Sequence, residues 1–154
     1  MQVTLMSILD LDKQVCHSVY SAANALVRTY RPLLEPLELT YPQYLVLLSL
    51  WEQDGVSIKH LVSHTRLDAG TLTPILKRLE AKKLLKRQAD SQDERQKRIV
   101  LTTKGQQLKQ RALTLPEELF CRFKSGLNLQ QAMELKKLCE MLYQALVEFE
   151  ESDS

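Results

Sequence analysis

The chain has 154 residues, of which 44% are hydrophobic and 26% charged, with only four glycines and five prolines. This length suits one domain with a buried core rather than two, and this composition excludes a disordered chain. Because it has neither an apolar run of membrane-spanning length nor a basic leader with a small-residue cleavage site, we expect a cytoplasmic protein without membrane contact.

Positive charge is concentrated in one part of the sequence. The whole chain carries +2, but the segment from Lys77 to Arg111 holds 12 Lys and Arg against 4 Asp and Glu. A local excess of this size predicts binding to phosphate groups.

The N-terminal third predicts two helices. Apolar residues recur three and four positions apart from Leu11 to about Leu34, which indicates a long amphipathic helix. A second helix is expected to begin after Thr40, with Pro42 in its first turn, and to end before Gly55. Its interior is apolar nearly all round, so we expect it to form the centre of the core.

The middle of the chain predicts a helix-turn-helix followed by a hairpin. Short helices at 57–64 and 71–84 flank the turn RLDAG, and two strands at 84–90 and 97–102 flank the polar tip SQDERQ. Two further helices are expected, from Thr103 to about Lys124 with a break near Pro116, and from Leu129 to about Glu150. The predicted fold class is mainly α, a winged helix-turn-helix with a two-stranded β wing and long terminal helices.

The first and last helices carry apolar stripes that so small a core cannot cover. The simplest solution is a two-fold homodimer in which the terminal helices of two chains interlock; the alternative is that they fold back on their own chain. We therefore expect one chain, 1–154, with dimerisation helices at 10–36 and 103–150 around a DNA-binding lobe at 41–101.

The lobe has candidate DNA contacts in its second motif helix and in its wing. At the N-terminal end of this helix, Thr71 and Thr73 are short donors for base edges or phosphates, and basic side chains lie further along. In the wing, Arg95 at the tip is placed to enter a narrow minor groove with Asp93 holding its guanidinium. The basic candidates that complete this set are Lys77, Arg78 and Lys97.

An ordinary solvated helix beside an exposed ion pair would also account for these residues. That alternative leaves the neighbouring bases Lys82, Lys83, Lys86 and Arg87 unexplained.

The string DAGTLTPILKRLEAKKLLKRQADSQDERQKRIVLTTKG resembles the recognition helix and wing of the MarR family, including its Asp-x-Arg signature at Asp93 and Arg95. The segment LDKQVCHSVYSAANALVRTYRPLLEPLELTYPQYLVLLSLWE resembles the organic hydroperoxide resistance regulators (OhrR) within that family. The resemblance implies a dimeric repressor that binds a pseudo-palindromic double-stranded DNA operator and is released from it by organic hydroperoxides.

Three cysteines and no secretory signal argue against a disulfide framework, which leaves buried fillers or reactive thiols. Cys16 falls in the first turns of a helix, where the positive end of the dipole favours a thiolate. The resemblance implies that Tyr30 and Tyr41 of the partner subunit donate hydrogen bonds to this thiolate, and that Cys121 or a small-molecule thiol resolves its oxidised form. We expect Cys139, in the apolar stripe of the last helix, to lie in the core.

No cofactor or metal is expected, and no catalytic constellation appears. His60 and His64 share a helix face but lack a third ligand, so exposed or phosphate-facing histidines are the better interpretation. Two other functions remain open beside a peroxide-sensing repressor. One is a MarR-type regulator that responds to a phenolic ligand, and the other is a thiol peroxidase that turns over with Cys16 and Cys121.

Overall fold

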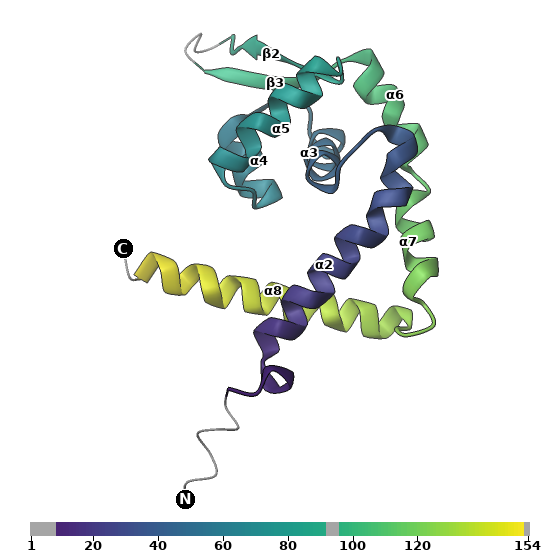
Figure 1. Ribbon diagram of the computed structural model, residues 1–154. Coiled ribbons are helices and arrows are strands. Elements are labelled where there is room, and N and C mark those ends of the chain that lie inside the picture. Colours follow the sequence, from purple (N-terminus) through teal and green to yellow (C-terminus); the bar gives the residue numbers. More distant parts are fainter. Residues whose placement is uncertain (1–8, 92–95, 153–154) are drawn as a thin grey trace, which may run out of the picture. The chain divides into compact units, whose positions relative to one another are not determined.

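The computed structural model describes residues 9–91 and 96–152 (Figure 1). The chain forms two compact units, Met1–Leu115 and Pro116–Ser154. Within the described residues, no helix combines the length and apolar character needed to cross a membrane.

The N-terminal segment is a short 3-10 helix, η1 (Leu11–Lys13), followed by the long helix α2 (Val15–Leu34) and a second 3-10 turn, η2 (Glu35–Leu37). Gln14 occupies the N-cap position of α2 without a capping hydrogen bond from its side chain. Only the C-terminal end of α2 is buried, through Tyr30, Leu33 and Leu34. Most of this helix is therefore not covered by its own unit.

The lobe follows in the predicted order. Its elements are α3 (Tyr41–Glu52), β1 (Val56–Ser57), α4 (Ile58–Thr65), α5 (Ala69–Ala81), β2 (Leu85–Ala89) and β3 (Lys97–Leu101). Local signals set their starts: the Thr40 N–H donates to Gln43 Oε1 at 3.2 Å before α3, and the His60 N–H donates to Ser57 Oγ at 3.1 Å before α4. This architecture confirms the predicted mainly helical winged fold.

The sheet has three strands rather than the two predicted. Its order is β1-β3-β2, with all pairs antiparallel, Val56 opposite Ile99 and Leu85 opposite Leu101. The extra strand, β1, has only two residues, and its pairing with β3 joins positions more than 40 residues apart. So short a strand has no local hydrophobic period, so it could not be predicted from the sequence.

Leucines from every layer of the lobe fill the core. Side chains that are at most 1% exposed come from α2, α3, α4, α5, β2 and β3: Leu34, Val46, Leu47, Leu50, Leu61, Leu72, Leu76, Leu79, Leu85 and Ile99.

The next helix, α6 (Thr103–Ala112), approaches this core closely at Gly105. A Cβ at Gly105 would lie 2.0 Å from the Leu84 carbonyl oxygen, and the Trp51 indole N–H donates to the Gly105 carbonyl at 2.9 Å. Glycine is therefore required at this position.

The remaining helices are α7 (Leu115–Phe123) and α8 (Leu129–Ser152). The break between α6 and α7 confirms the interruption predicted near Pro116, which lies in the first turn of α7 where its missing N–H has no helical partner to lose. Asn128 caps α8 through its Oδ1, which accepts from the Gln131 N–H at 2.9 Å.

Candidate functional site

Helix α5, the second helix of the helix-turn-helix, begins with a cap that makes several hydrogen bonds. Asp68 accepts hydrogen bonds from the Thr71 N–H at 2.8 Å and from the Thr71 hydroxyl at 2.6 Å, and these bonds hold the pKa of Asp68 below its ordinary value. The Thr73 hydroxyl donates to the Ala69 carbonyl at 2.9 Å. Both threonines are exposed as predicted, but their protons are used within the chain, so their oxygens are left to accept hydrogen bonds from a ligand.

The outward face of α5 carries free cations. Lys77 and Arg78 are exposed, on the side away from the buried Leu76 and Leu79. Within residues 9–91 and 96–152, no hydrogen bond or ion pair holds either side chain. Lys97 is exposed at the start of β3. The predicted wing-tip residues, Asp93 and Arg95, lie outside the described residues.

Other basic residues of the same segment hold the lobe together. Lysine and arginine side chains from Lys82, Lys104, Lys109 and Arg111 donate to the backbone carbonyls of Glu38, Lys82, Trp51 and Pro36 respectively. Arg98 donates to Asp90 at 2.6 Å and to the Gly55 carbonyl at 2.8 Å, which ties the wing to the turn before β1.

Arg87 pairs with Glu80 at 3.5 Å. Part of the positive charge that suggested phosphate binding is thus structural, and Lys82 and Arg87 have roles without DNA.

Cys16 is the second residue of α2 and is exposed. Its thiol lies 4.0 Å from Gln14 Oε1. This placement agrees with the predicted position in the first turn of a helix.

Tyr30 and Tyr41 lie together, in a cluster that also contains Tyr44. The ring centroids of Tyr30 and Tyr41 are 4.7 Å apart, and Tyr44 lies 5.8 Å from Tyr30 and 6.5 Å from Tyr41. Burial raises the pKa of all three phenols, with repulsion from Tyr41 and Tyr44 adding to it at Tyr30. The tyrosines therefore stay protonated at neutral pH and remain hydrogen-bond donors.

The cysteine and this tyrosine cluster are separated along one helix. Cys16 and Tyr30 both lie in α2, and 14 residues of α-helix span about 21 Å. A thiol at one end of α2 cannot reach the phenol at the other end of the same helix.

The other two cysteines lie in the second unit. Cys121 is exposed on α7, near the edge-to-face ring pair of Phe120 and Phe123. The expectation that Cys139 is a core residue is wrong for the single chain, because Cys139 is exposed on α8. Neighbouring apolar residues of α8, such as Leu138 and Leu142, are exposed as well.

The histidines of α4 make contacts inside the lobe. His64 Nδ1 lies 2.8 Å from Ser49 Oγ, and its Nε2 lies 3.5 Å from Glu52. The His60 ring is 5.5 Å from that of His64. In the described part of the chain, no group of three or more His, Cys, Asp or Glu side chains is arranged to hold a metal ion.

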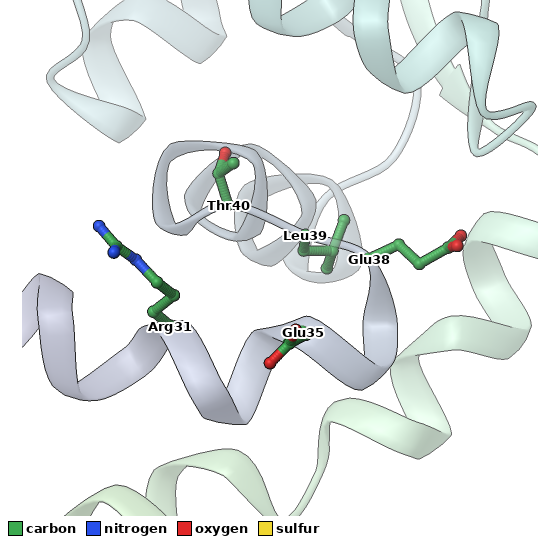
Figure 2. Close-up of a pocket in the computed structure, with 5 residues that line it drawn as sticks. All are labelled: Arg31, Glu35, Glu38, Leu39 and Thr40. Carbon is green, nitrogen blue, oxygen red and sulfur yellow. The ribbon is translucent and has the colours of Figure 1, made fainter.

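A cavity of about 300 Å³ lies beside the tyrosine cluster. Figure 2 shows its lining residues at the end of α2 and before α3: Arg31, Glu35, Glu38, Leu39 and Thr40. Arg31 directly follows Tyr30 and Thr40 directly precedes Tyr41 in the sequence, so the cavity is lined by the segment that joins these two tyrosines.

Sequence reasoning missed Tyr44 and Gln43. Tyr44 follows Tyr41 by three positions on a predicted helix, and this spacing alone places two side chains on one face. Gln43 gave no such signal, since a polar residue in the first turn of a helix is ordinarily exposed, whereas here it is 3% exposed.

A family model described as transcriptional regulator SarA/Rot matches residues 28–112. The HTH-type transcriptional regulator TtmR of Methylorubrum extorquens is 57% identical over 106 residues; the match covers 69% of this chain and about half, 54%, of that relative. The organic hydroperoxide resistance transcriptional regulator of Bacillus subtilis is 39% identical over 138 residues, which are 90% of each chain.

Among solved structures, reduced AbfR bound to DNA superimposes with a TM-score of 0.70 and 35% identity, over 93% of this chain and 97% of that one. AbfR, from Staphylococcus epidermidis, has also been solved overoxidised on DNA and in a disulfide form.

Proposed function

The chain belongs to the MarR family of winged-helix transcriptional regulators, and from that membership we propose that it is a dimeric repressor that releases its operator when organic hydroperoxides oxidise Cys16. The observation that carries this proposal is that, within one chain, the Cys16 thiol lies far from the phenols of Tyr30 and Tyr41. Cys16 is exposed at the start of α2, while Tyr30, near the other end of α2, packs against Tyr41 at the start of α3. Only a second chain can bring such groups into contact.

The apolar surface of the long helices supports a second chain as the partner. On α2, Val15 is 71% exposed and Tyr20 70%; on α8, Leu138 is 55% and Leu146 57% exposed. Stripes of this kind mark association surfaces in soluble proteins. In the proposed homodimer, the helices at 10–36 and 103–150 interlock, and each lobe at 41–101 is left free to meet DNA.

Each lobe would place α5 in a major groove of a pseudo-palindromic operator. Lys77, Arg78 and Lys97 provide cations, and Thr71 and Thr73 provide hydroxyl oxygens, at the outward end of the lobe. Asp93 and Arg95 complete the proposed contact at the minor groove. In a two-fold dimer the half-sites are spaced about one helical turn apart.

Oxidation would act at the junction of the two subunits. The Cys16 thiolate attacks the terminal oxygen of the hydroperoxide and the O–O bond breaks. Sulfur loses two electrons and becomes a sulfenic acid, and the alkoxide that leaves takes a proton from solvent to become the alcohol. The tyrosine hydrogen bonds to sulfur are then lost. The sulfenic acid condenses with the thiol of Cys121 or of a small molecule, forming a disulfide and releasing water.

The test is a mobility shift of operator DNA with and without cumene hydroperoxide. We expect Cys16→Ser to bind DNA as the wild type does but to remain bound after oxidation. Cys139→Ser, the matched control at another exposed cysteine, is expected to be released. If the Cys16→Ser protein still dissociates on oxidation, Cys16 is not the sensor.

Intact mass after one equivalent of hydroperoxide identifies the resolving thiol. A crosslink between Cys16 and Cys121 supports the intramolecular or intersubunit disulfide, and a mixed disulfide with added thiol supports the small molecule. Steady consumption of peroxide with a dithiol reductant would instead favour a thiol peroxidase.

The cavity of Figure 2 favours a second candidate, a MarR-type regulator that responds to a phenolic acid. Arg31 offers a guanidinium to a carboxylate, and Leu39 offers an apolar wall. Titration of the DNA complex of Cys16→Ser with salicylate separates the two functions. Release without any oxidant would favour the ligand-responsive regulator.

A further inference from the structure

The buried side-chain amide of Gln43 connects the start of α3 to the end of α5. Its Oε1 accepts from the Thr40 N–H at 3.2 Å and from Lys82 Nζ at 3.2 Å. Thr40 directly precedes Tyr41, whose ring lies against that of Tyr30. A single acceptor therefore joins the backbone that carries the tyrosine cluster to the Lys82 ammonium.

Lys82 belongs to the end of the recognition helix. It is the C-cap residue of α5, and its backbone N–H donates to the Arg78 carbonyl at 3.1 Å. Its Nζ also donates to the carbonyl of Glu38, in the turn that joins α2 to α3. The Lys82 ammonium, at the end of α5, thus binds both ends of the segment from Glu38 to Gln43. Both bonds are charge-assisted hydrogen bonds, whose strength depends on the positions of donor and acceptor.

We propose that Lys82 is a positioning residue that transmits the arrangement of the tyrosine cluster to the recognition helix, which rests on the proposed role of Tyr30 and Tyr41 in sensing. When the tyrosines lose their contacts to oxidised Cys16, the segment from Glu38 to Gln43 shifts. The ammonium follows its two acceptors and carries the C-terminal end of α5 with it. Among the described residues, the bonds of Lys82 Nζ to Glu38 and Gln43 join this segment directly to that helix end.

The coupling between Tyr41 and the end of α5 through Lys82 is measured by a double-mutant cycle, because a chain of contacts alone does not establish coupling. The readout is hydrogen exchange of the amides of Lys82, Lys83 and Leu84, whose N–H groups close the end of α5. Reduced protein is compared as wild type, Tyr41→Ala, Lys82→Met and the double variant, without DNA or oxidant. The amides of β3 report any global unfolding.

We expect Tyr41→Ala to speed exchange at these three amides by about fivefold or more, the lower end of typical coupling between sites. In the Lys82→Met protein, Tyr41→Ala is expected to leave the exchange rates of these amides unchanged. An equal effect in both backgrounds, or no effect in the otherwise wild-type chain, would overturn the proposal.

Lys109→Met is the matched control. It removes the same kind of bond, from Lys109 Nζ to the Trp51 carbonyl at 3.0 Å, at the other end of α3. The effect of Tyr41→Ala is expected to persist in this background. If Lys82→Met fails to fold, Gln43→Met removes the shared acceptor instead and is expected to abolish the effect, whereas Lys82→Arg is expected to retain it.

A mobility shift with and without cumene hydroperoxide then separates the two proposals. If the wild type is never released from DNA, redox sensing is wrong, and the exchange cycle still decides the role of Lys82. If the wild type and Lys82→Met are released by the same factor, sensing stands and transmission through Lys82 is wrong.

Discussion

Helices α4 and α5 of the lobe and the long helices α2 and α8 share an amphipathic pattern, but they differ in whether their apolar side chains are buried. In the lobe, Leu47 and Leu76 are fully buried among other side chains of the same unit. On α8, Leu138 and Leu146 remain more than half exposed. The leucines of the lobe are buried by side chains of their own unit, whereas those of α8 are exposed.

This difference teaches that the period of a helix specifies which face is apolar but not which molecule covers it. Exposed apolar area costs about 25 cal/mol for each Å² that a partner would remove from water. The lobe should therefore be stable at any concentration, whereas the outer helices should gain their stability from association. Changing one leucine in each region distinguishes the two sources.

The largest effect is expected from a charge in the apolar stripe of α8. Leu138→Glu places a carboxylate on each side of the proposed interface. Burying each one costs about 2 kcal/mol, and the cost for both subunits corresponds to a dissociation constant about a thousandfold higher. Sedimentation velocity over a dilution series measures the dissociation constant. Gln144→Glu, which adds the same charge elsewhere on α8, is the control. Unchanged association of Leu138→Glu would show that this stripe is not the interface.

The next effect is a cavity in the lobe. Leu76 is fully buried, so Leu76→Ala is expected to lower the free energy of unfolding by about 2–5 kcal/mol. Urea denaturation followed by the fluorescence of Trp51 measures this change. Leu113→Ala, at a residue that is 60% exposed, should change it by about 0.5 kcal/mol or less. Equal losses at both positions would contradict the division between buried and uncovered leucines.

What the sequence predicted well depended on local signals. The periodicity of α2 and α8, the cap at Thr40 and the break near Pro116 are each encoded within a few residues, and the structure agrees with them. Cys16 was placed at a helix start by the same kind of local reasoning. The hairpin of the wing was predicted from two strand-like segments on either side of a polar tip, and β2 and β3 lie in these segments.

What the sequence could not predict depends on tertiary contacts. Whether a lysine meets phosphate or a carbonyl is not local: Lys82 reaches Glu38, 44 positions earlier in the chain. The strand β1 exists only through its pairing with β3. Cys139 is exposed although it lies in an apolar stripe, because the period of a helix does not specify what covers that stripe.

The two kinds of cation within the lobe give the third prediction. Arg78→Ala is expected to weaken operator binding about tenfold and to lower the salt slope by about one, because it would remove one proposed phosphate contact. Lys104→Ala, whose ammonium donates to the Lys82 carbonyl, should leave that slope unchanged. Fluorescence anisotropy at several salt concentrations measures both. Equal slopes for Arg78→Ala and wild type would remove Arg78 from the DNA contact.

The smallest effect concerns the pH dependence of the cap on α5. The hydrogen bonds from Thr71 lower the pKa of Asp68 in the folded chain, so the ionised carboxylate contributes stability above its ordinary pKa of about 4. That contribution is lost as pH falls through the lowered folded value. Asp68→Asn keeps a capping oxygen but no charge, so it should be slightly less stable than the wild type at pH 7 and should converge with it in strong acid. Urea titrations at a series of pH values measure the difference, and a constant gap across that range would show that the charge of Asp68 does not contribute.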